Sequence, residues 1–219
     1  MHVLKKDENG NYIKSENPYM AYASKDIKSD VITFYMQTAQ LKNIYRQGWF
    51  ELVGEDHYVE FESVADHSWA VALLAISIIH DKQLPYSIEK CLKIAIIHDL
   101  NEIYAGDFTP LSNVSNAEKE CAHNASIEKL LNSVNFNNSF KELVVEYEAQ
   151  QSDEAIFIKQ VDKLECVMQA ACYGINVNYM KYSLKNITHH ALLDIVEELK
   201  TLTADKEIPY NIRTGRKKL

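Results

Sequence analysis

Apolar residues recur at helical spacing along most of this chain, and short polar breaks separate the periodic segments. The run from Ala70 to Ile79 is almost wholly apolar, which predicts a buried central helix. We therefore expect an all-α globule rather than a sheet protein. The predicted helices cover residues 30–47, 63–80, 87–106, 116–132, a segment ending at Glu148, 153–176 and 188–203.

The length of the chain limits the number of domains. A chain of 219 residues is long enough for one substantial core and short for two. We expect one helical domain over residues 29–205, with an N-terminal extension over 1–28 and a basic C-terminal tail over 206–219. In the extension, Asn9-Gly10 lies between two short apolar pairs, a pattern compatible with a small hairpin. Neither end is assigned a function.

Charge and hydropathy argue against several classes of protein. A net charge of -8 is unlike that of a general nucleic-acid binder, which needs a basic face to neutralise phosphates. No window has the length and apolarity of a membrane span, and the first residues lack a signal-peptide core, so we expect a soluble, cytoplasmic protein. The cysteines form no Cys-x-x-Cys pair and are expected to be reduced core residues: Cys91, Cys121, Cys166 and Cys172.

The stretch 97–107 places four ionisable side chains in a largely apolar segment. Residues three and four apart on a helix are neighbours, so Glu102 is expected to share a face with His98 and Asp99. An imidazole beside a carboxylate suits a divalent ion of intermediate hardness. The alternative is a solvated acidic surface, although the preceding apolar run makes an unpaired buried charge costly. Asp107, in the loop that follows, lies near the same end as Glu102.

Two side chains from other predicted helices are candidates to complete such a site. His67 lies in the first turns of the central helix, at the rim of its apolar run, and a satisfied core histidine is the alternative reading. Asp162 lies between the apolar residues of the helix over 153–176 and needs a counter-charge. A metal ion or an ion pair with Lys159 or Lys163 meets that need.

Arginine is rare in this chain, which has three arginines and twenty lysines. Arg46 lies far from the basic tail, so it is a candidate for a role that needs a planar, bidentate cation. Trp49 follows three residues later, where it could pack on a sugar or base or simply belong to the core.

Four motifs in order resemble the HD-domain metallohydrolases, whose pattern is His, then His-Asp, then a distant Asp, and in particular their 5'-deoxynucleotidase branch. That branch removes the phosphate of deoxyribonucleoside 5'-monophosphates. The resemblance covers about residues 30–180. The motifs are Arg46-Gln47-Gly48-Trp49, Glu62-Ser63-Val64-Ala65-Asp66-His67, His98-Asp99-Leu100-Asn101-Glu102 with Gly106-Asp107, and Lys159-Gln160-Val161-Asp162-Lys163.

This resemblance implies an all-α HD-domain helical bundle with a buried divalent-metal site. It implies four ligands for one divalent transition metal (Mn, Co, Fe, Ni or Zn): His67, His98, Asp99 and Asp162. It also implies an acid/base carboxylate, a catalytic carboxylate that contacts substrate, a phosphate or substrate contact and a residue that shapes the sugar pocket, which are Glu102, Asp107, Arg46 and Trp49 respectively. Some relatives place the Trp directly after the Arg, whereas two residues intervene here.

The expected function is metal-dependent removal of the 5'-phosphate of (deoxy)ribonucleoside monophosphates, giving nucleoside and phosphate. We expect the substrate to be a small nucleotide, with neither nucleic acid nor membrane as a partner, and the family implies a homodimer. Two alternatives stay open: an HD-type phosphohydrolase of nucleoside triphosphates or cyclic nucleotides, and a non-catalytic nucleotide-binding protein on the same frame.

Overall fold

The computed structural model describes residues 4–15, 27–54, 60–109, 112, 114–135 and 139–209. Regular structure in these residues is almost entirely helical and includes a single two-stranded sheet, so the predicted all-α fold is confirmed. The elements in chain order are β1 (Lys5–Lys6), β2 (Tyr12–Ile13), α1 (Asp30–Thr38), η2 (Ala39–Lys42), α2 (Gln47–Val53), α3 (Val64–Lys82), α4 (Ile88–Ile97), α5 (Glu102–Ala105), α6 (Asn116–Asn132), α7 (Ser139–Glu148), α8 (Asp153–Cys172), η4 (Val177–Tyr179), α9 (Lys181–Lys185) and α10 (His190–Leu202).

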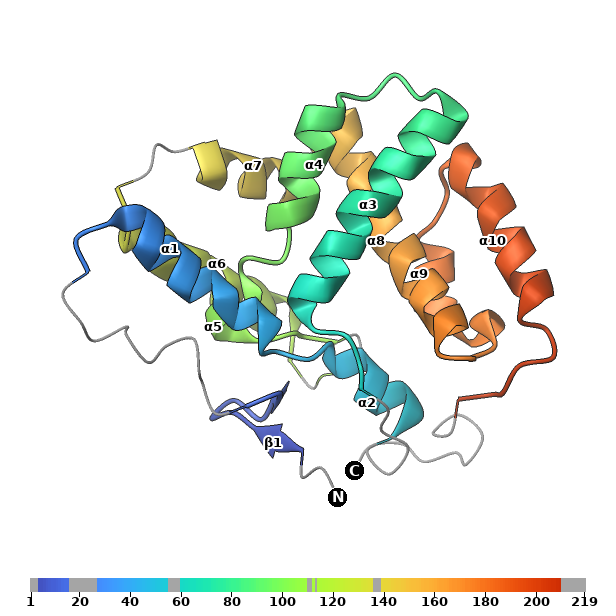
Figure 1. The fold of residues 1–219 in the computed structure, drawn as a ribbon, viewed down its shortest axis with the longest axis horizontal. Helices are drawn as coiled ribbons and strands as arrows, with labels where there is room; N and C mark the ends of the chain where they lie inside the picture. Colours follow the sequence, from blue (N-terminus) through green and yellow to red (C-terminus); the bar gives the residue numbers. More distant parts are fainter. Residues whose placement is uncertain are drawn as a thin grey trace.

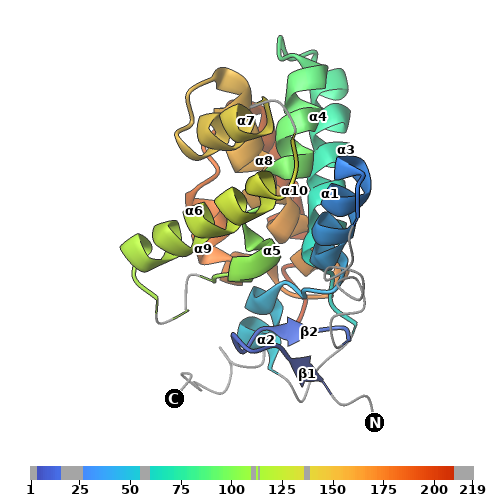
Figure 2. The same ribbon diagram turned by 90° about the vertical axis from the view of Figure 1, so that its left-hand side faces the viewer.

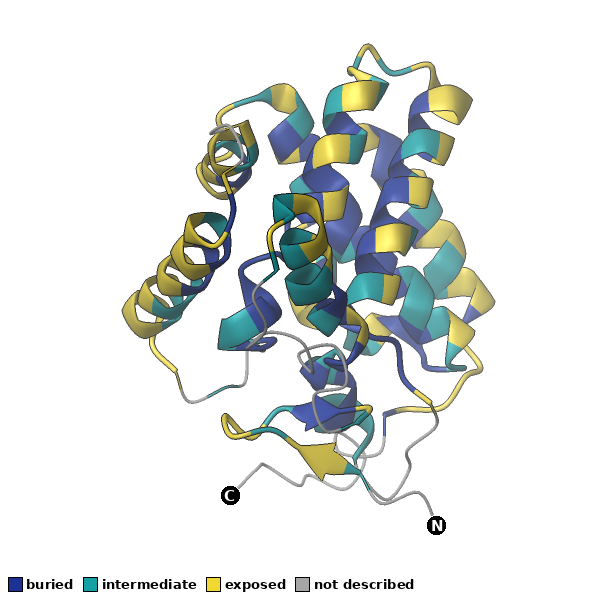
Figure 3. Cartoon of the chain, turned by 60° about the vertical axis from the view of Figure 1, so that its left-hand side comes forward, coloured by how far each residue is buried: buried dark blue, intermediate teal, exposed yellow. Residues whose placement is uncertain are grey.

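Three helices form the centre of the molecule. α3 packs against α4 and α8, and α4 and α8 also contact each other (Figure 1). α7 covers α4 and α8 on one side, while α9 and α10 pack against α8 on the other. The strands and α2 lie together at one end of this bundle (Figure 2). Buried positions face inward along each central helix and exposed positions face outward (Figure 3).

The central helix α3 has a well-defined start. The Ser63 hydroxyl accepts the Asp66 backbone N–H at 3.2 Å, and the Asp66 carboxylate accepts the Ser63 backbone N–H at 2.8 Å. This reciprocal capping box satisfies two N–H groups that a helix start otherwise leaves unpaired. Val71 and Ala75 are fully buried, and His67 lies one turn before Val71 on the same inward face. The local sequence therefore directs the His67 side chain into the core.

The helix predicted over residues 30–47 is wrong in its second half. α1 ends at Thr38, the 3-10 turn η2 follows, and Ile44 and Tyr45 form isolated bridges, one with strand β2 and the other with the residue before α3. These partners are distant in sequence, so local periodicity does not reveal them. Arg46 consequently lies in extended backbone at the start of α2 and not at a helix exit.

The single helix predicted around His98 and Glu102 is also wrong. α4 ends at Ile97, His98 caps it, a turn follows, and the short helix α5 begins at Glu102. Gly106 ends α5 with a φ of 81°, a conformation that favours glycine. A Cβ at Gly106 would also meet the side-chain amide of Asn11 in the hairpin, which would have to move.

The remaining predicted helices agree with α6, α7, α8 and α10 to within a few residues. α8 is capped by the Ser152 side chain, and it ends at Cys172, four residues earlier than expected. The elements η4 and α9, which follow it, were not predicted. The expectation that the cysteines are core residues is wrong for Cys121 and Cys172, which are exposed, while Cys91 is buried.

The predicted ends of the chain are described in part. Residues 4–15 contain the antiparallel pair β1 and β2, with Lys5 opposite Ile13. In the predicted tail, residues 210–219 lie outside the described part of the chain. The division into an extension, one domain and a tail stays a prediction. Across the described helices, none is long and apolar enough to cross a membrane.

Candidate metal centre

Four side chains converge at the point where the first turns of α3, the end of α4 and the middle of α8 meet. His67 Nε2 lies 3.2 Å from Asp162 Oδ1 and 3.8 Å from Asp99 Oδ2. His98 Nε2 lies 3.2 Å from the same Asp99 oxygen. The four residues that sequence reasoning selected as ligands are therefore neighbours, although they come from three different helices.

The two imidazoles each leave one nitrogen without a hydrogen bond. His67 and His98 are almost completely buried, and the Nε2 atom of each lacks a hydrogen-bond partner despite the nearby carboxylates. A buried polar atom without a partner costs about 1–3 kcal/mol. Both Nε2 atoms lie beside the carboxylate oxygens of Asp99 and Asp162. A cation bound between these atoms would give both nitrogens a partner.

The spacing of these atoms fits a divalent transition metal. Bond lengths of about 2.0–2.2 Å to nitrogen and oxygen place neighbouring ligand atoms about 3–3.5 Å apart. His67, His98 and Asp99 offer atoms that lie within 4.8 Å of one another, and so do His67, Asp162 and Cys166. Two imidazoles and two carboxylates form a mixed N/O set of the kind that Mn, Fe, Co, Ni and Zn accept. The residues present therefore fit such an ion.

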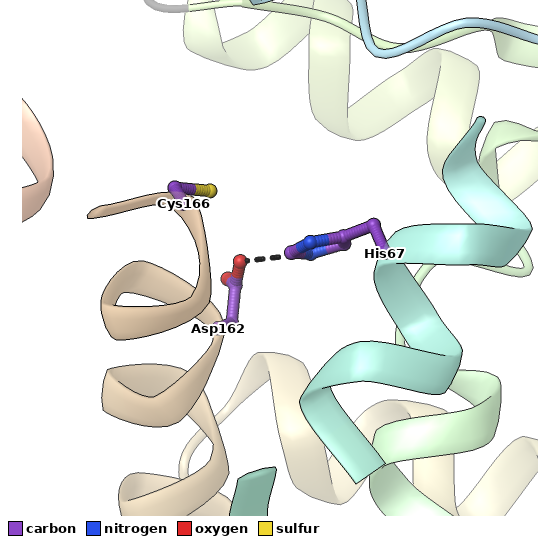
Figure 4. Close-up of side chains that lie close together, drawn as sticks. All are labelled: His67, Asp162 and Cys166. Carbon is purple, nitrogen blue, oxygen red and sulfur yellow. Dashed lines mark ion pairs between the residues drawn. The ribbon is translucent and has the colours of Figure 1, made fainter. Parts of the chain in front are cut away.

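Figure 4 shows how α3 and α8 face each other at this site. The His67 ring extends from α3 toward the Asp162 carboxylate on α8, and Cys166 lies one helical turn beyond Asp162. The Cys166 thiol is half-buried and accepts a 3.6 Å hydrogen bond from Arg46 Nη2. Burial raises the pKa of this thiol to about 11, so it is neutral at pH 7.

The charges of the candidate ligands depend on one another. Burial opposes the ionisation of Asp162, but Lys163, at 2.9 Å, and His67 hold the pKa of its carboxyl well below the ordinary value. Burial also opposes the ionisation of Asp99, but the nearby His98 and Arg46 have the larger effect and lower the pKa of its carboxyl. Both carboxylates are therefore charged at neutral pH. Burial and Arg46 lower the pKa of His67, yet Glu165 and Asp162 raise it overall, so binding of a metal ion to Nε2 would release a proton.

Each candidate histidine is fixed by a hydrogen bond at its other ring nitrogen. His67 Nδ1 lies 2.5 Å from Glu165 Oε2, and His98 Nδ1 lies 2.8 Å from the Ala95 carbonyl oxygen. An acceptor at Nδ1 places the proton there and leaves the Nε2 lone pair for a metal.

Glu102 lies beside this cluster and is buried. Its Oε2 atom has no hydrogen-bond partner. Burial, followed by the charges of Asp99 and Asp107, raises the pKa of Glu102 well above its ordinary value, while Arg46 lowers it less. This carboxyl therefore keeps its proton to a higher pH than an exposed glutamate does, which suits a proton donor.

Arg46 and Asp107 form the next layer of the site. Arg46 Nη1 lies 3.5 Å from Asp99 Oδ2 and 3.5 Å from Asp107 Oδ1. The other Asp107 oxygen accepts the Gln47 backbone N–H at 2.7 Å, so Asp107 also holds the start of α2. The guanidinium thus points toward the candidate ligands.

Trp49 lies in the core. Its indole N–H donates to Glu62 Oε1 at 2.9 Å, and its ring packs edge-on against Tyr173 with a centroid separation of 5.1 Å. Burial and the neighbouring Glu165 raise the pKa of Glu62 to about 7. A contact between Trp49 and a sugar stays a prediction.

Sequence reasoning assigned no role to three residues that touch the cluster, Glu165, Glu62 and Tyr147. Glu165 and Glu62 form a buried group with His67, in which the nitrogen and carboxylate oxygens lie within 4.8 Å of one another. Lys163 was considered only as a counter-charge, and it pairs with Asp162. The Tyr147 hydroxyl donates to Asp162 at 3.4 Å. The signal for Glu165 was present, since it lies three residues after Asp162 in the same apolar stripe.

Comparison with known proteins assigns this arrangement to a family. A family model described as HD domain matches residues 38–203. The 5'-deoxynucleotidase HDDC2 of Mus musculus is 29% identical over 191 residues, which span 83% of this chain and 92% of the relative. The 5'-deoxynucleotidase hdd1 of Schizosaccharomyces pombe is 36% identical over 155 residues, which span 68% of this chain and 74% of the relative.

Solved structures share the fold. The PH0347 protein of Pyrococcus horikoshii superposes with a TM-score of 0.64 at 28% identity, covering 78% of this chain and 99% of its own. A predicted metal-dependent phosphohydrolase from Magnetospirillum magnetotacticum superposes with a TM-score of 0.59 at 20% identity, covering 85% of this chain and 93% of its own.

Proposed function

Because this chain belongs to the HD domain family, whose model matches residues 38–203, we propose that it is a metal-dependent phosphohydrolase that removes the 5'-phosphate of nucleoside monophosphates. Relatives that cover most of the chain carry the name 5'-deoxynucleotidase. The observation that carries the proposal is the buried cluster of two imidazoles with unpaired Nε2 atoms and two carboxylates, beside a buried glutamate and an arginine. A purely binding protein has no need of that glutamate.

The ion is held by His67, His98, Asp99 and Asp162 in this proposal. A divalent ion bound there lowers the pKa of water and polarises a phosphoryl group. Two neutral imidazoles and two carboxylates leave coordination positions for water and substrate. The identity of the metal depends on availability as well as on these donors, so Mn, Fe, Co, Ni and Zn are all candidates.

Arg46 and Glu102 perform the remaining chemistry. The Arg46 side chain is 15% exposed and lies among carboxylates, and its planar fork can bind two phosphate oxygens, which orients the phosphorus for attack by water. Glu102, whose pKa is raised by burial, keeps its proton to a higher pH than an exposed glutamate and delivers it to the 5' oxygen as the P–O bond breaks. Water supplies the new oxygen on phosphorus, and the proton that it gives up restores the protonated Glu102, so the products are a nucleoside and inorganic phosphate.

Asp107 and Trp49 have supporting roles in this scheme. Asp107 fixes Arg46 by an ion pair and α2 by its contact with the Gln47 N–H, and its carboxylate is a candidate substrate contact. Trp49 is proposed to shape the sugar side of the site through its position on α2, one turn after Arg46.

The proposed activity is tested by measuring phosphate release from a panel of nucleotides. Metal-free protein is loaded with Mn, Co, Fe, Ni or Zn and assayed with deoxy- and ribonucleoside monophosphates, deoxynucleoside triphosphates and cyclic nucleotides. We expect inorganic phosphate from the monophosphates only after metal is added. Triphosphate release from deoxynucleoside triphosphates would instead favour the alternative phosphohydrolase reading, and binding without any product would favour a non-catalytic protein.

We also propose that two copies of this chain associate through the outer face of α3 and α4. Trp69 and Leu73 lie one turn apart on α3 and are 67% and 50% exposed, and Ile96, on the helix α4 that packs against α3, is 58% exposed. Large exposed apolar side chains that gather on one face are typical of interfaces between proteins. A symmetric pairing of these uncharged side chains would bury them against each other. A cytoplasmic location likewise stays a prediction.

Replacing Trp69 by glutamate is expected to turn a dimer into a monomer, because a charge would then be buried in an apolar contact. Light scattering coupled to size-exclusion chromatography measures the mass directly. The matched control is Leu202→Glu, since Leu202 is equally exposed, at 61%, but lies on α10. A wild-type protein that elutes as a monomer at all concentrations contradicts the proposed dimer.

A further inference from the structure

Glu165 is a buried carboxylate whose position the proposed reaction does not explain. Its side chain is 4% exposed, and its Oε2 atom lies 2.5 Å from His67 Nδ1. Among the described residues, the ion-pair partner of Glu165 is this histidine and not a lysine or arginine. Taking a carboxylate out of water is costly unless it is paired, so the contact with His67 accounts for its burial.

The two nitrogens of His67 face opposite partners. Nδ1 faces Glu165, while Nε2 faces Asp162 and Asp99 and has no hydrogen-bond partner. Asp162 and Glu165 are both on α8, three residues apart, and therefore one helical face contacts both sides of the same ring. Glu165 determines which nitrogen carries the proton, and hence which one offers its lone pair.

We propose that Glu165 is a positioning residue of the metal centre: its carboxylate accepts the Nδ1–H of His67 and so presents Nε2 to the ion. This proposal rests on the proposed function, because it requires a metal at the cluster. A carboxylate in this position also raises the basicity of the imidazole and locks the orientation of the ring. Glu165 acts through His67 and does not touch substrate.

A second buried glutamate is close to Glu165. An oxygen of Glu62 lies within 4.8 Å of the ligand atoms offered by His67 and Glu165, and its carboxylate accepts the indole N–H of Trp49. Trp49 holds the Glu62 carboxylate by this hydrogen bond, and Glu62 thereby stays close to the Glu165 carboxylate. The side chains of Trp49, Glu62 and Glu165 thus connect α2 to His67 at the proposed metal centre.

The test compares Co²⁺ binding by the metal-free wild type and Glu165 variants, measured by isothermal titration calorimetry. Glu165→Leu removes the acceptor and is expected to weaken Co²⁺ binding about 10- to 100-fold. Glu165→Gln retains an oxygen that accepts the Nδ1–H, and it is expected to recover most of that affinity. The matched control is Thr203→Val, since Thr203 is similarly buried and hydrogen-bonded but lies at the end of α10.

A spectroscopic readout separates positioning from a loss of stability. Long-range ¹H–¹⁵N spectra of the Zn²⁺-loaded protein, assigned with a His67→Gln variant, report which ring nitrogen carries the proton. We expect a slowly exchanging Nδ1–H of His67 in wild type and in Glu165→Gln. If Glu165→Leu does not fold, the Gln variant still tests the proposal, because a His67 that carries its proton on Nε2 there would overturn it.

Several results distinguish failure of this proposal from failure of the proposed function. If wild type binds no Co²⁺, both are overturned. If wild type binds Co²⁺ and a folded Glu165→Leu binds it equally well, only the role of Glu165 is overturned. If wild type binds two Co²⁺ ions and Glu165→Leu binds one, Glu165 is a direct ligand of the second ion. That result would also overturn its positioning role.

Discussion

Replacing Asp162 by asparagine is expected to remove the bound metal and to lower phosphate release by at least about 10³-fold. Asp162 is charged at neutral pH because Lys163 and His67 outweigh its burial, and it is the proposed metal ligand on α8. Asparagine has nearly the same shape but lacks the negative charge that attracts a divalent ion. Loss of the several kcal/mol that a metal contributes to the transition state corresponds to this factor, at about 1.4 kcal/mol for each tenfold.

The effect of Asp162→Asn is measured as metal content by mass spectrometry and as phosphate release under the same conditions. Asp194→Asn is the control, because Asp194 is an exposed aspartate on α10. We expect the control to keep both metal and activity. A variant at Asp162 that keeps a full equivalent of tightly bound metal would remove this residue from the ligand set.

The helical frame of this protein was largely predictable from periodicity. The apolar stripes of α3, α6 and α8 are long and regular, so their type and approximate ends follow from local sequence. The breaks at residues 43–46 and 98–101 were not predictable in this way. The first depends on bridges from Ile44 and Tyr45 to segments far away in the chain, and the second is a turn inside an apolar run.

The candidate ligands were selected correctly as neighbours, although part of the reasoning was wrong. We placed Glu102 on the same continuous helix as His98, whereas a turn separates α4 from α5. Within that turn the Glu102 backbone N–H donates to the Asp99 carbonyl oxygen at 3.0 Å, which keeps Glu102 beside the cluster. Glu165 was missed because spacing alone does not distinguish a carboxylate that orients a histidine from one that faces solvent. The contact between Glu165 and His67 depends on the ring orientation of His67, which only the three-dimensional structure reveals.

Local sequence also could not place Trp49. A tryptophan near an arginine is compatible with a sugar contact or with a core position, and the burial of its ring depends on Tyr173, more than a hundred residues away. The same reasoning applies to Asp107, whose two oxygens contact Arg46 and the start of α2. The contacts of Trp49 and Asp107 both depend on how α2 packs against distant parts of the chain, which local sequence does not reveal.

Replacing Glu102 by glutamine is expected to lower the rate of phosphate release by about 10²- to 10⁴-fold while leaving the metal in place, because general acid catalysis contributes this much. Glutamine fills the same buried space and can still donate a hydrogen bond, but it cannot transfer a proton. The effect should fall on kcat, since Glu102 is proposed to act as the P–O bond breaks. Metal content and KM are expected to stay near the wild-type values.

The pH dependence gives this prediction a second, independent readout. The pKa of Glu102 is raised by burial and by Asp99 and Asp107, so its proton is present at low pH and is lost only as the pH rises through the raised value. Wild-type kcat should therefore fall on the alkaline side, and Glu102→Gln should lack that fall. The control is Glu142→Gln, at an exposed glutamate of α7. A Glu102→Gln protein that retains wild-type kcat and the alkaline fall would show that the proton comes from another group, and water would then be the remaining donor.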